Sequence, residues 1–146
     1  MKENNSIKAK IITIGDELLL GQVVNTNASW LGEQLNLNGF QLESVLTVGD
    51  GEKDIMKVLC SCQDTNIVII TGGLGPTADD ITKPTLCKFF DTELILNNDA
   101  LENINEIFKL RGYVMTERNR LQAFIPKSCT YIPNRFGTAP CMWFEK

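Results

Sequence analysis

Histidine is absent from the 146 residues of this sequence. Mechanisms that use imidazole as a base, as a triad member or as a zinc ligand are therefore excluded within the chain. Any catalysis must use carboxylates, hydroxyls, lysine, thiols or a metal ion held by oxygen. The five cysteines are odd in number and scattered, which is typical of reduced thiols in a cytosolic protein. Cys60 and Cys62 are spaced poorly for a metal site and are interpreted as packing residues.

Clusters of basic residues and long apolar runs are also scarce. The formal net charge is −4, and only Arg111, Arg118 and Arg120 approach a cluster. A broad nucleic-acid surface needs gathered lysines and arginines, so we expect no nucleic-acid partner. No apolar run approaches the roughly 20 residues of a membrane-spanning helix, and the polar start lacks the apolar core of a signal peptide. These absences predict a cytoplasmic protein that does not enter a membrane.

The order of apolar patterns predicts an α/β fold. Strand patterns cover residues 8–14, 40–48 and 67–70, and helical patterns follow each of them, beginning near Asn25, around Ile55 and at Thr82. Alternating strands and helices form a parallel sheet with helices on both faces. The unbroken apolar run of residues 67–70 predicts the central strand, and the alternating residues 40–48 a strand nearer the edge.

A glycine loop follows the third strand pattern, in the segment NIVIITGGLGPTADDITKPT from Asn66 to Thr85. Glycine permits close approach of a ligand to the main chain, so this loop predicts a cradle for something flat or anionic. Asp79 and Asp80 form a carboxylate pair at its far side. Thr82 is the expected N-cap of the next helix, with Pro84 in its first turn. The loop residues expected to contact a ligand are Thr71, Gly72, Gly73, Gly75, Thr77 and Asp79.

Further acidic residues follow the other strand patterns. Gly15, Asp16 and Glu17 come after the first strand, and Asp50 lies in the turn after the second. Ligands of open α/β sheets bind in crevices at the carboxyl ends of the strands. Ligand contact by these residues and a purely local role in turns or helix starts both remain open.

The last third of the sequence is less regular. Gly137, Thr138, Ala139 and Pro140 form a second loop of small residues, and a strand pattern begins at Met142. We expect residues 1–146 to be a single domain, cut from a longer protein near its carboxyl end. Trp30 and Trp143 are expected in the core, and Lys83 is expected to be solvated.

Four segments resemble the amino-terminal domain of the CinA, or competence/damage-inducible, proteins of the molybdopterin-binding-like superfamily (MoaB, MogA and MoeA). They are IITIGDELLLGQVVNTN from Ile11, VGDGEKDI from Val48, TGGLGPTADDITKPT from Thr71, and NRLQAFIP followed by NRFGTAP. Two departures stand out: Cys141 replaces the glycine of the family's GTAPG loop, and a later LPGVP-like loop is missing.

The resemblance implies a three-layer α/β/α sandwich with a mostly parallel, mixed sheet, assembled as a homo-oligomer. It implies binding of a phosphorylated pterin or nucleotide-like ligand and, for CinA-type members, hydrolysis of ADP-ribose with a divalent cation such as Mg²⁺, Co²⁺ or Mn²⁺. Asp50 and Asp80 would be the catalytic and metal-binding residues. The deamidase activity of CinA proteins belongs to a separate domain that is not expected here. The implied ligand-binding residues are Gly15, Asp16, Glu17, Asn25, Thr71, Gly72, Gly73, Gly75, Thr77, Asp79, Gly137, Thr138, Ala139 and Pro140.

Three functional interpretations remain open at this point. The first is metal-assisted attack of water on a pyrophosphate, organised by Asp80 and Asp50, with loop amides holding phosphate oxygens. The second is a non-catalytic module that binds molybdopterin or a related phosphorylated ligand. The third is a stable fold with an incomplete cleft and no activity.

Overall fold

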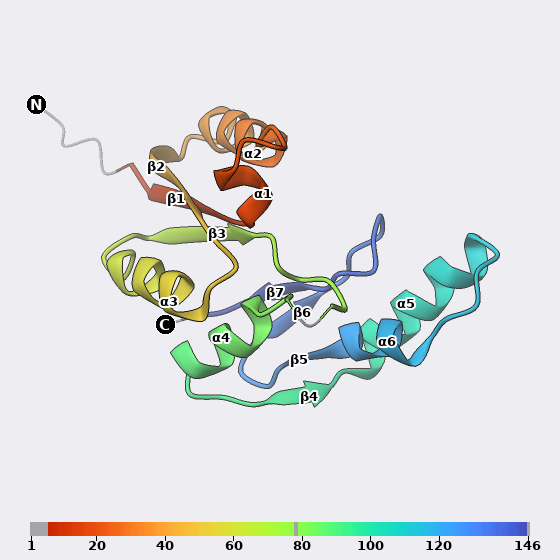
Figure 1. Cartoon of the computed structure of the whole chain (residues 1–146). Coiled ribbons are helices and arrows are strands. Elements are labelled where there is room, and N and C mark those ends of the chain that lie inside the picture. Colours follow the sequence, from red (N-terminus) through yellow and green to blue (C-terminus); the bar gives the residue numbers. More distant parts are fainter. Residues whose placement is uncertain (1–5, 78, 146) are drawn as a thin grey trace, which may run out of the picture. The chain divides into compact units, whose positions relative to one another are not determined.

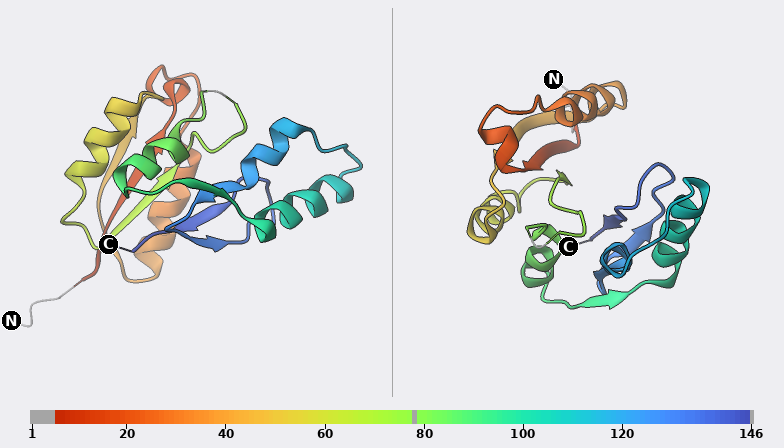
Figure 2. Two further views of the ribbon diagram at one scale, coloured as in Figure 1. Left: turned by 90° about the horizontal axis from the view of Figure 1, so that it is seen from below. Right: turned by 45° about the vertical axis from the view of Figure 1, so that its right-hand side comes forward.

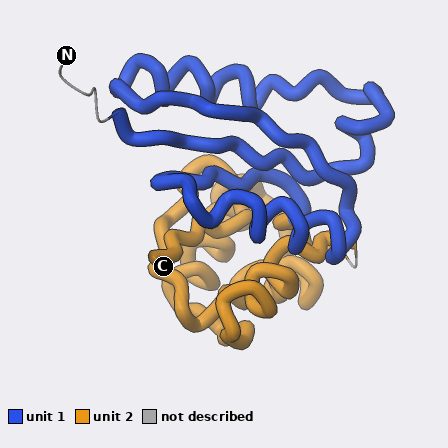
Figure 3. Tube along the Cα trace, turned by 90° about the vertical axis from the view of Figure 1, so that its left-hand side faces the viewer, with its two compact units in different colours: residues 1–73 blue, residues 74–146 orange. Residues whose placement is uncertain are grey.

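The structure, a computed structural model, describes residues 6–77 and 79–145. The chain divides into two compact units, residues 1–73 and 74–146 (Figure 3). The first unit contains β1 (Lys8–Ile14), α1 (Asp16–Leu19), α2 (Thr26–Leu37), β2 (Gln41–Val48), α3 (Glu52–Ser61) and β3 (Ile67–Thr71). The interpretation of residues 1–146 as one domain stays a prediction.

A parallel three-stranded sheet with the order β2-β1-β3 forms the frame of the first unit. Ile11 of β1 is level with Val45 of β2 and Ile69 of β3. β1 is the central strand, and its Ile11 and Ile12 are fully buried. The prediction that residues 67–70 form the central strand is therefore wrong, because β3 lies at one edge of this sheet. An apolar run indicates covered faces but does not report how many strands pair with its edges.

Helices cover both faces of the parallel sheet (Figures 1 and 2). On one face, Ala9 and Ile11 pack against Ala28 and Leu35 of α2. The helix α3 lies on the opposite face and buries its own apolar stripe, Ile55, Val58 and Leu59. Successive side chains of a strand alternate between faces, so β1 contributes to both layers of core. The predicted α/β class with a parallel sheet is confirmed.

The second unit has shorter strands, of three residues each. Its elements are α4 (Thr82–Phe89), β4 (Leu94–Leu96), α5 (Asn98–Leu110), α6 (Glu117–Arg120), the 3-10 helix η1 (Leu121–Ala123), β5 (Phe124–Pro126), β6 (Thr130–Ile132) and β7 (Cys141–Trp143). The strands form two antiparallel pairs, β4 with β5 and β6 with β7. Ala100 and Ile104 of α5 pack with Ala123 in its core.

Two local expectations are wrong. Thr82 is the first residue of α4 and is buried, while Ile81 holds the cap position. The tryptophans are not core residues, since Trp30 is 60% exposed and Trp143 is 48% exposed. Sequence patterns show on which side of a helix or strand the apolar side chains lie, but they do not show whether other parts of the protein cover that side.

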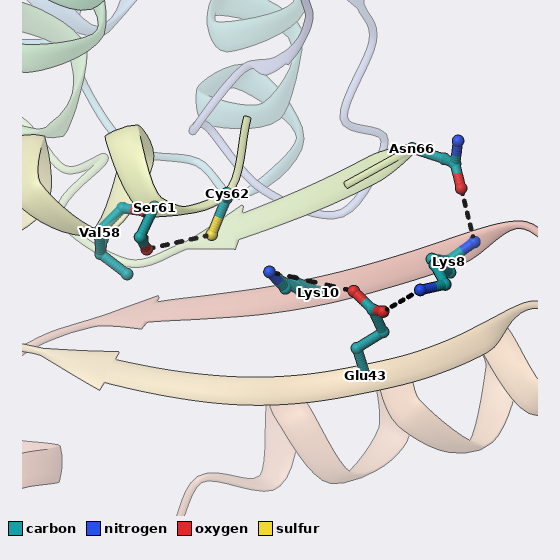
Figure 4. A network of polar contacts seen from close by, with 7 residues as sticks. All are labelled: Lys8, Lys10, Glu43, Val58, Ser61, Cys62 and Asn66. Carbon is teal, nitrogen blue, oxygen red and sulfur yellow. Dashed lines mark hydrogen bonds and ion pairs between the residues drawn. The ribbon is translucent and has the colours of Figure 1, made fainter. Parts of the chain in front are cut away.

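A polar network ties together the amino ends of the strands in the first unit (Figure 4). The Lys8 Nζ atom lies 2.8 Å from Glu43 Oε1, and the Lys8 main-chain N–H donates to Asn66 Oδ1 at 2.9 Å. Lys10 adds a longer ion pair to Glu43, at 3.9 Å. These charges satisfy one another at the end of the sheet where the strands begin. Among residues 6–77 and 79–145, no helix is long and apolar enough to cross a membrane.

Candidate functional site

The carboxyl ends of β1, β2 and β3 meet at one edge of the parallel sheet, as expected. Each strand is followed by a glycine: Gly15, Gly49 and Gly72. The Gly15 N–H donates to Val48 O at 3.0 Å and so fastens the first turn to the neighbouring strand end. Small residues at this edge leave room for the polar side chains that follow them.

Asp16 and Asp50 hold the first two strand-end turns together. The Asp16 N–H donates to Asp50 Oδ2 at 3.1 Å, and the Asp50 N–H donates to Asp16 Oδ1 at 3.2 Å. A side chain at Gly49 would collide with the Asp16 carboxylate and would displace it from this pairing. The two carboxylates are therefore paired with main chain, which is a turn-fixing role. Ligand contact by either residue stays a prediction.

Gly72, directly after β3, lies close against Ile14 at the end of β1. Its φ of 104° lies in a region that favours glycine, and a Cβ atom there would overlap the main-chain carbonyl oxygen of Ile14. No residue with a side chain fits this position without moving the backbone. The glycine requirement at the start of the loop is thus set by packing within the protein.

Thr13 and Asn25 form a polar network beneath this edge. Thr13 is 1% exposed. Its Oγ1 atom accepts from Asn25 Nδ2 at 3.0 Å and lies 2.9 Å from the Thr47 hydroxyl oxygen. Asn25 Oδ1 in turn accepts from the Ala28 N–H at 3.1 Å, which caps α2. The Asn25 side chain is thus engaged in fixing the start of α2, and its predicted ligand contact stays a prediction.

A cleft of about 150 Å³ opens beside this network within the first unit. Its wall combines hydroxyl and amide side chains, apolar side chains and the carboxylate of Glu17. It is lined by Thr13, Ile14, Glu17, Leu18, Val23, Val24, Asn25, Thr26, Asn27, Thr71 and Gly72. Four predicted ligand-binding residues, Glu17, Asn25, Thr71 and Gly72, are therefore brought together.

The second half of the glycine loop folds around Asp80. Asp80 Oδ1 accepts from the Gly75 N–H at 2.8 Å, and Oδ2 accepts from the Thr77 N–H at 2.7 Å and from the Thr77 hydroxyl. A Cβ atom at Gly75 would collide with this carboxylate. The Arg118 Nε–H also donates to Pro76 O at 3.1 Å and anchors the loop from α6. The Gly75 N–H and the Thr77 hydroxyl, which were expected to contact a ligand, donate to Asp80 in this structure.

These donors determine the charge of Asp80. Burial acts to raise its pKa, but the bonds from Thr77 and Gly75 outweigh burial. The charge of Lys83 acts in the same direction as those bonds. The pKa of Asp80 therefore lies below its usual value, and the group is a carboxylate at neutral pH.

Lys83 is buried rather than solvated, which corrects the expectation from the sequence. It is 5% exposed, and its Nζ atom donates to Gln122 O at 3.1 Å and Phe124 O at 3.0 Å. Burial lowers the pKa of this ammonium, while Asp80 acts to raise it. Lys83 thus fastens the start of α4 to η1 and β5, close in sequence to Asp80.

The small-residue loop of Gly137 to Pro140 is organised by Asn134. Asn134 Oδ1 accepts from the N–H groups of Phe136 and Gly137 at 3.0 and 3.1 Å, and Nδ2 donates to Ala139 O at 2.9 Å. Gly137, Thr138 and Ala139 are half-buried and Pro140 is buried. The four residues therefore form a defined loop, and their ligand contact stays a prediction.

The predicted site residues fall into three groups, one per loop system. Gly15, Asp16, Glu17, Asn25, Asp50 and Thr71 to Gly73 belong to the first unit; Gly75, Thr77, Asp79 and Asp80 form one loop of the second; Gly137 to Pro140 form another. Asp79 is exposed, and its main-chain oxygen accepts from Ile81 N–H. A cation shared by Asp50 and Asp80 stays a prediction.

Comparison with known proteins identifies the family. The model of the family described as "Probable molybdopterin binding domain" matches residues 10–145. The chain is 36% identical to the CinA protein of Thermoplasma acidophilum, whose crystal structure is described as that of a protein of unknown function. The two structures match with a TM-score of 0.81 over 94% of this chain and 81% of that one. The chain belongs to the molybdopterin-binding domain family, as a CinA-like member. The resemblance seen in the sequence is confirmed.

Curated relatives of this CinA-like domain are longer proteins. A CinA-like protein of Cytophaga hutchinsonii is 47% identical over 143 residues, which are 97% of this chain and 34% of the relative. A CinA-like protein of Flavobacterium psychrophilum is 40% identical over 96% of this chain and 34% of its own length. The chain thus spans about a third of the length of these relatives. The molybdopterin biosynthesis enzyme MoaB of Thermus thermophilus, 21% identical with a TM-score of 0.56 over 82% of this chain and 79% of that one, shares the fold.

The donor set of this CinA-like domain fits one kind of cation site. Among residues 6–77 and 79–145, no three Asp, Glu or Cys side chains are gathered around a common point. Magnesium commonly uses one or two protein carboxylates together with ligand phosphates, and Asp80 Oδ1, which accepts one hydrogen bond, retains acceptor capacity. The residues therefore fit a cation that arrives with a phosphorylated ligand, held by Asp80 or Asp50, rather than a cage of protein ligands.

Sequence reasoning missed several residues that shape the site of this domain. Thr13 interrupts a run of isoleucines, and a hydroxyl at a buried strand position is itself a signal of a polar network. Asn134 precedes a turn, where asparagine commonly bonds to nearby main chain. Lys83 stands between positions that the helical period places in the core. For Thr13 and Lys83 the signal was a polar residue at a position that the pattern makes internal.

Proposed function

We propose that this domain binds a phosphorylated small molecule and hydrolyses the pyrophosphate bond of ADP-ribose with a divalent cation. In this reaction the oxygen of water bonds to one phosphorus, the bridging P–O bond breaks, and AMP and ribose 5-phosphate are released. The observation that carries the proposal is Asp80, an ionised carboxylate fixed against the glycine loop by three donors. Membership of the CinA-like group supports the choice of ADP-ribose.

Each part of the loop system has a role in this proposal. Gly73 presents main chain to the ligand phosphates, because a glycine has no side chain that would block their close approach. Asp80, with Asp50, holds the cation, for which Mg²⁺, Co²⁺ and Mn²⁺ are candidates. When bound, the cation supplies positive charge that offsets the charge of the pyrophosphate. Asp80 is positioned before any ligand arrives, which avoids reorganisation during the reaction.

The test is release of AMP from ADP-ribose by the purified chain with each of the three cations. We expect Asp80→Asn to lower kcat at least 100-fold, since the amide cannot hold a cation as a carboxylate does. Asp64→Asn is a matched control, because Asp64 is exposed in the turn before β3. No AMP release by the unaltered chain, or unchanged release by Asp80→Asn, contradicts the proposal.

A second variant separates the charge of Asp80 from its effect on the loop. Thr77→Val removes the hydroxyl donor to Asp80 and leaves the carboxylate in place. We expect Thr77→Val to retain most of the dependence of the rate on cation concentration, while Asp80→Asn loses it. Equal loss in both variants would indicate that Asp80 acts only through the conformation of the loop.

A non-catalytic role in binding molybdopterin is the second candidate function. The family description favours it, since the model that matches residues 10–145 is that of a molybdopterin-binding domain. Calorimetric titration with molybdopterin and with ADP-ribose separates the two candidates. Tight binding of molybdopterin, with no AMP release from ADP-ribose, favours this second function.

A further inference from the structure

The cleft of the first unit has an electrostatic character that differs from that of a phosphate site. Glu17 contributes a carboxylate to its wall, and the other lining residues are neutral. The Glu17 carboxylate lies against Gly15, at the carboxyl end of β1. A phosphate placed in this cleft would face this like charge without a lysine or arginine in the wall to offset it.

The nearby start of α2 does not reverse this preference. A helix N-terminus attracts anions through its free N–H groups. Here the Ala28 N–H donates to the Asn25 side chain, and the Thr26 N–H donates to Val24 O at 2.8 Å. Two donors that a phosphate would use in the first turn are therefore satisfied within the protein.

The remaining groups of the wall favour a neutral ring that donates hydrogen bonds. The Glu17 carboxylate accepts hydrogen bonds, and the Thr71 and Asn27 side chains can both donate and accept them. Leu18 and Val23 supply an apolar wall. Pockets for whole drug-sized ligands are usually about 300 to 1,000 Å³, so a cleft of about 150 Å³ accommodates one part of a larger ligand.

We propose that this cleft is the subsite for the uncharged ring of the phosphorylated ligand, and that Glu17 selects that ring by accepting hydrogen bonds from it. The ring is either the ribose of a nucleotide, which donates from its vicinal hydroxyls, or a pterin, which donates from the N–H groups along its edge. This inference rests on the proposed function for the existence of such a ligand. It assigns the phosphates to the glycine loop and the ring to the cleft.

The experiment compares three probes on two variants by calorimetry. The probes are ADP-ribose, a phosphorylated pterin, and inorganic pyrophosphate, which carries the charge without a ring. Glu17→Gln keeps the size of the side chain and leaves the hydrogen bonds to the Glu17 main-chain oxygen from Gln22 and Val23 in place. Glu33→Gln, on the exposed side of α2, is the matched control.

We expect Glu17→Gln to weaken binding of ADP-ribose or of the phosphorylated pterin about 10-fold, which corresponds to about 1.4 kcal/mol. Binding of pyrophosphate should be unchanged or slightly tighter, because a negative charge has been removed near the loop. The probe whose binding is weakened by Glu17→Gln identifies the ring. A general structural defect would weaken pyrophosphate as well, so this probe is an internal control.

Two results would overturn the inference. If Glu17→Gln weakened the binding of all three probes equally, Glu17 would not select the ring. If the binding of both ring-containing probes were unchanged, Glu17 would not belong to the site. Binding without AMP release leaves the ring subsite standing while the proposed hydrolysis fails. If the unaltered chain binds none of the three probes, both proposals are wrong.

Discussion

The two units of this domain are ordered by different kinds of interaction. In the first, β1 pairs with two parallel strands over five or more residues each, and fully buried isoleucines fill the space beneath the helices. In the second, each antiparallel pair joins three-residue strands. Its loops depend instead on polar side chains that bond to main chain, above all Asp80, Lys83 and Asn134.

This difference changes what a single substitution can do. A regular sheet shares its stability among many main-chain bonds and apolar contacts, so a polar side chain at its edge can be exchanged at small cost. A loop held by one buried polar group loses its conformation when that group is removed, because the partner main-chain atoms are left unsatisfied. We therefore expect polar substitutions to be more costly in the second unit, and steric ones in the first.

Gly72→Ala should have the largest effect and tests the steric part of this comparison. The new Cβ atom would overlap Ile14 O, and the residue already has a φ of 104°. We expect the free energy of unfolding to fall by about 3 kcal/mol or more. Urea denaturation followed by circular dichroism measures it.

Gly21→Ala is the matched control for Gly72→Ala. Gly21 has a φ of 69°, and a Cβ atom there meets nothing within 4 Å. Only the backbone conformation is then penalised, at about 1 kcal/mol. Equal losses in the two variants would show that the contact between β3 and β1 does not determine the choice of glycine at position 72.

Lys83→Met tests the polar part of the comparison. Methionine fills a similar volume but donates no hydrogen bond, so Gln122 O and Phe124 O lose their donor. Relief of the buried charge offsets part of this loss. We expect a net destabilisation of about 2 kcal/mol, measured by urea denaturation.

Lys109→Met provides the reference for that measurement. Lys109 is exposed in the last turn of α5. We expect a change within about 0.5 kcal/mol there, as is usual for surface substitutions. If Lys83→Met lowered the free energy of unfolding no more than Lys109→Met, the second unit would not depend on its buried polar residues.

The first unit was the more predictable of the two from the sequence. Residues 8–14 and 40–48 were expected as strands and form β1 and β2, and the helix expected from near Asn25 is α2, which Asn25 caps. These features follow from local periodicity and local hydrogen bonding, which the sequence records directly. The position of β3 at the edge of the sheet was missed, since pairing partners lie far apart in the chain.

The second unit shows why site residues are harder to predict than elements. Asp80 was correctly expected beside the glycine loop, but its donors depend on how residues 75–80 turn. Lys83 was expected in solvent, and its carbonyl partners lie 39 and 41 residues further along the chain. Interactions of a polar side chain with distant main chain have no periodic signature, so only the folded structure reveals them.

The pH dependence of stability gives a smaller and more specific test, centred on Asp80. Its pKa in the folded chain is lower than the ordinary value of 3.8, because the donors of the loop outweigh burial. A group with a depressed folded pKa contributes stability above its unfolded pKa and loses that contribution as the pH falls through the folded pKa. The contribution is therefore complete at neutral pH and declines below about pH 4.

Asp80→Asn should thus be less stable than the unaltered chain by about 1 kcal/mol at pH 7, and the difference should shrink as the pH falls below about 4. Urea denaturation at several pH values measures this difference. Asp64→Asn, at an exposed position in the turn before β3, is the control. A deficit for Asp80→Asn that stays constant with pH would mean that the loop depends on the shape of the Asp80 side chain rather than on its charge. The charge-based role of Asp80 in holding a cation would then lose its support as well.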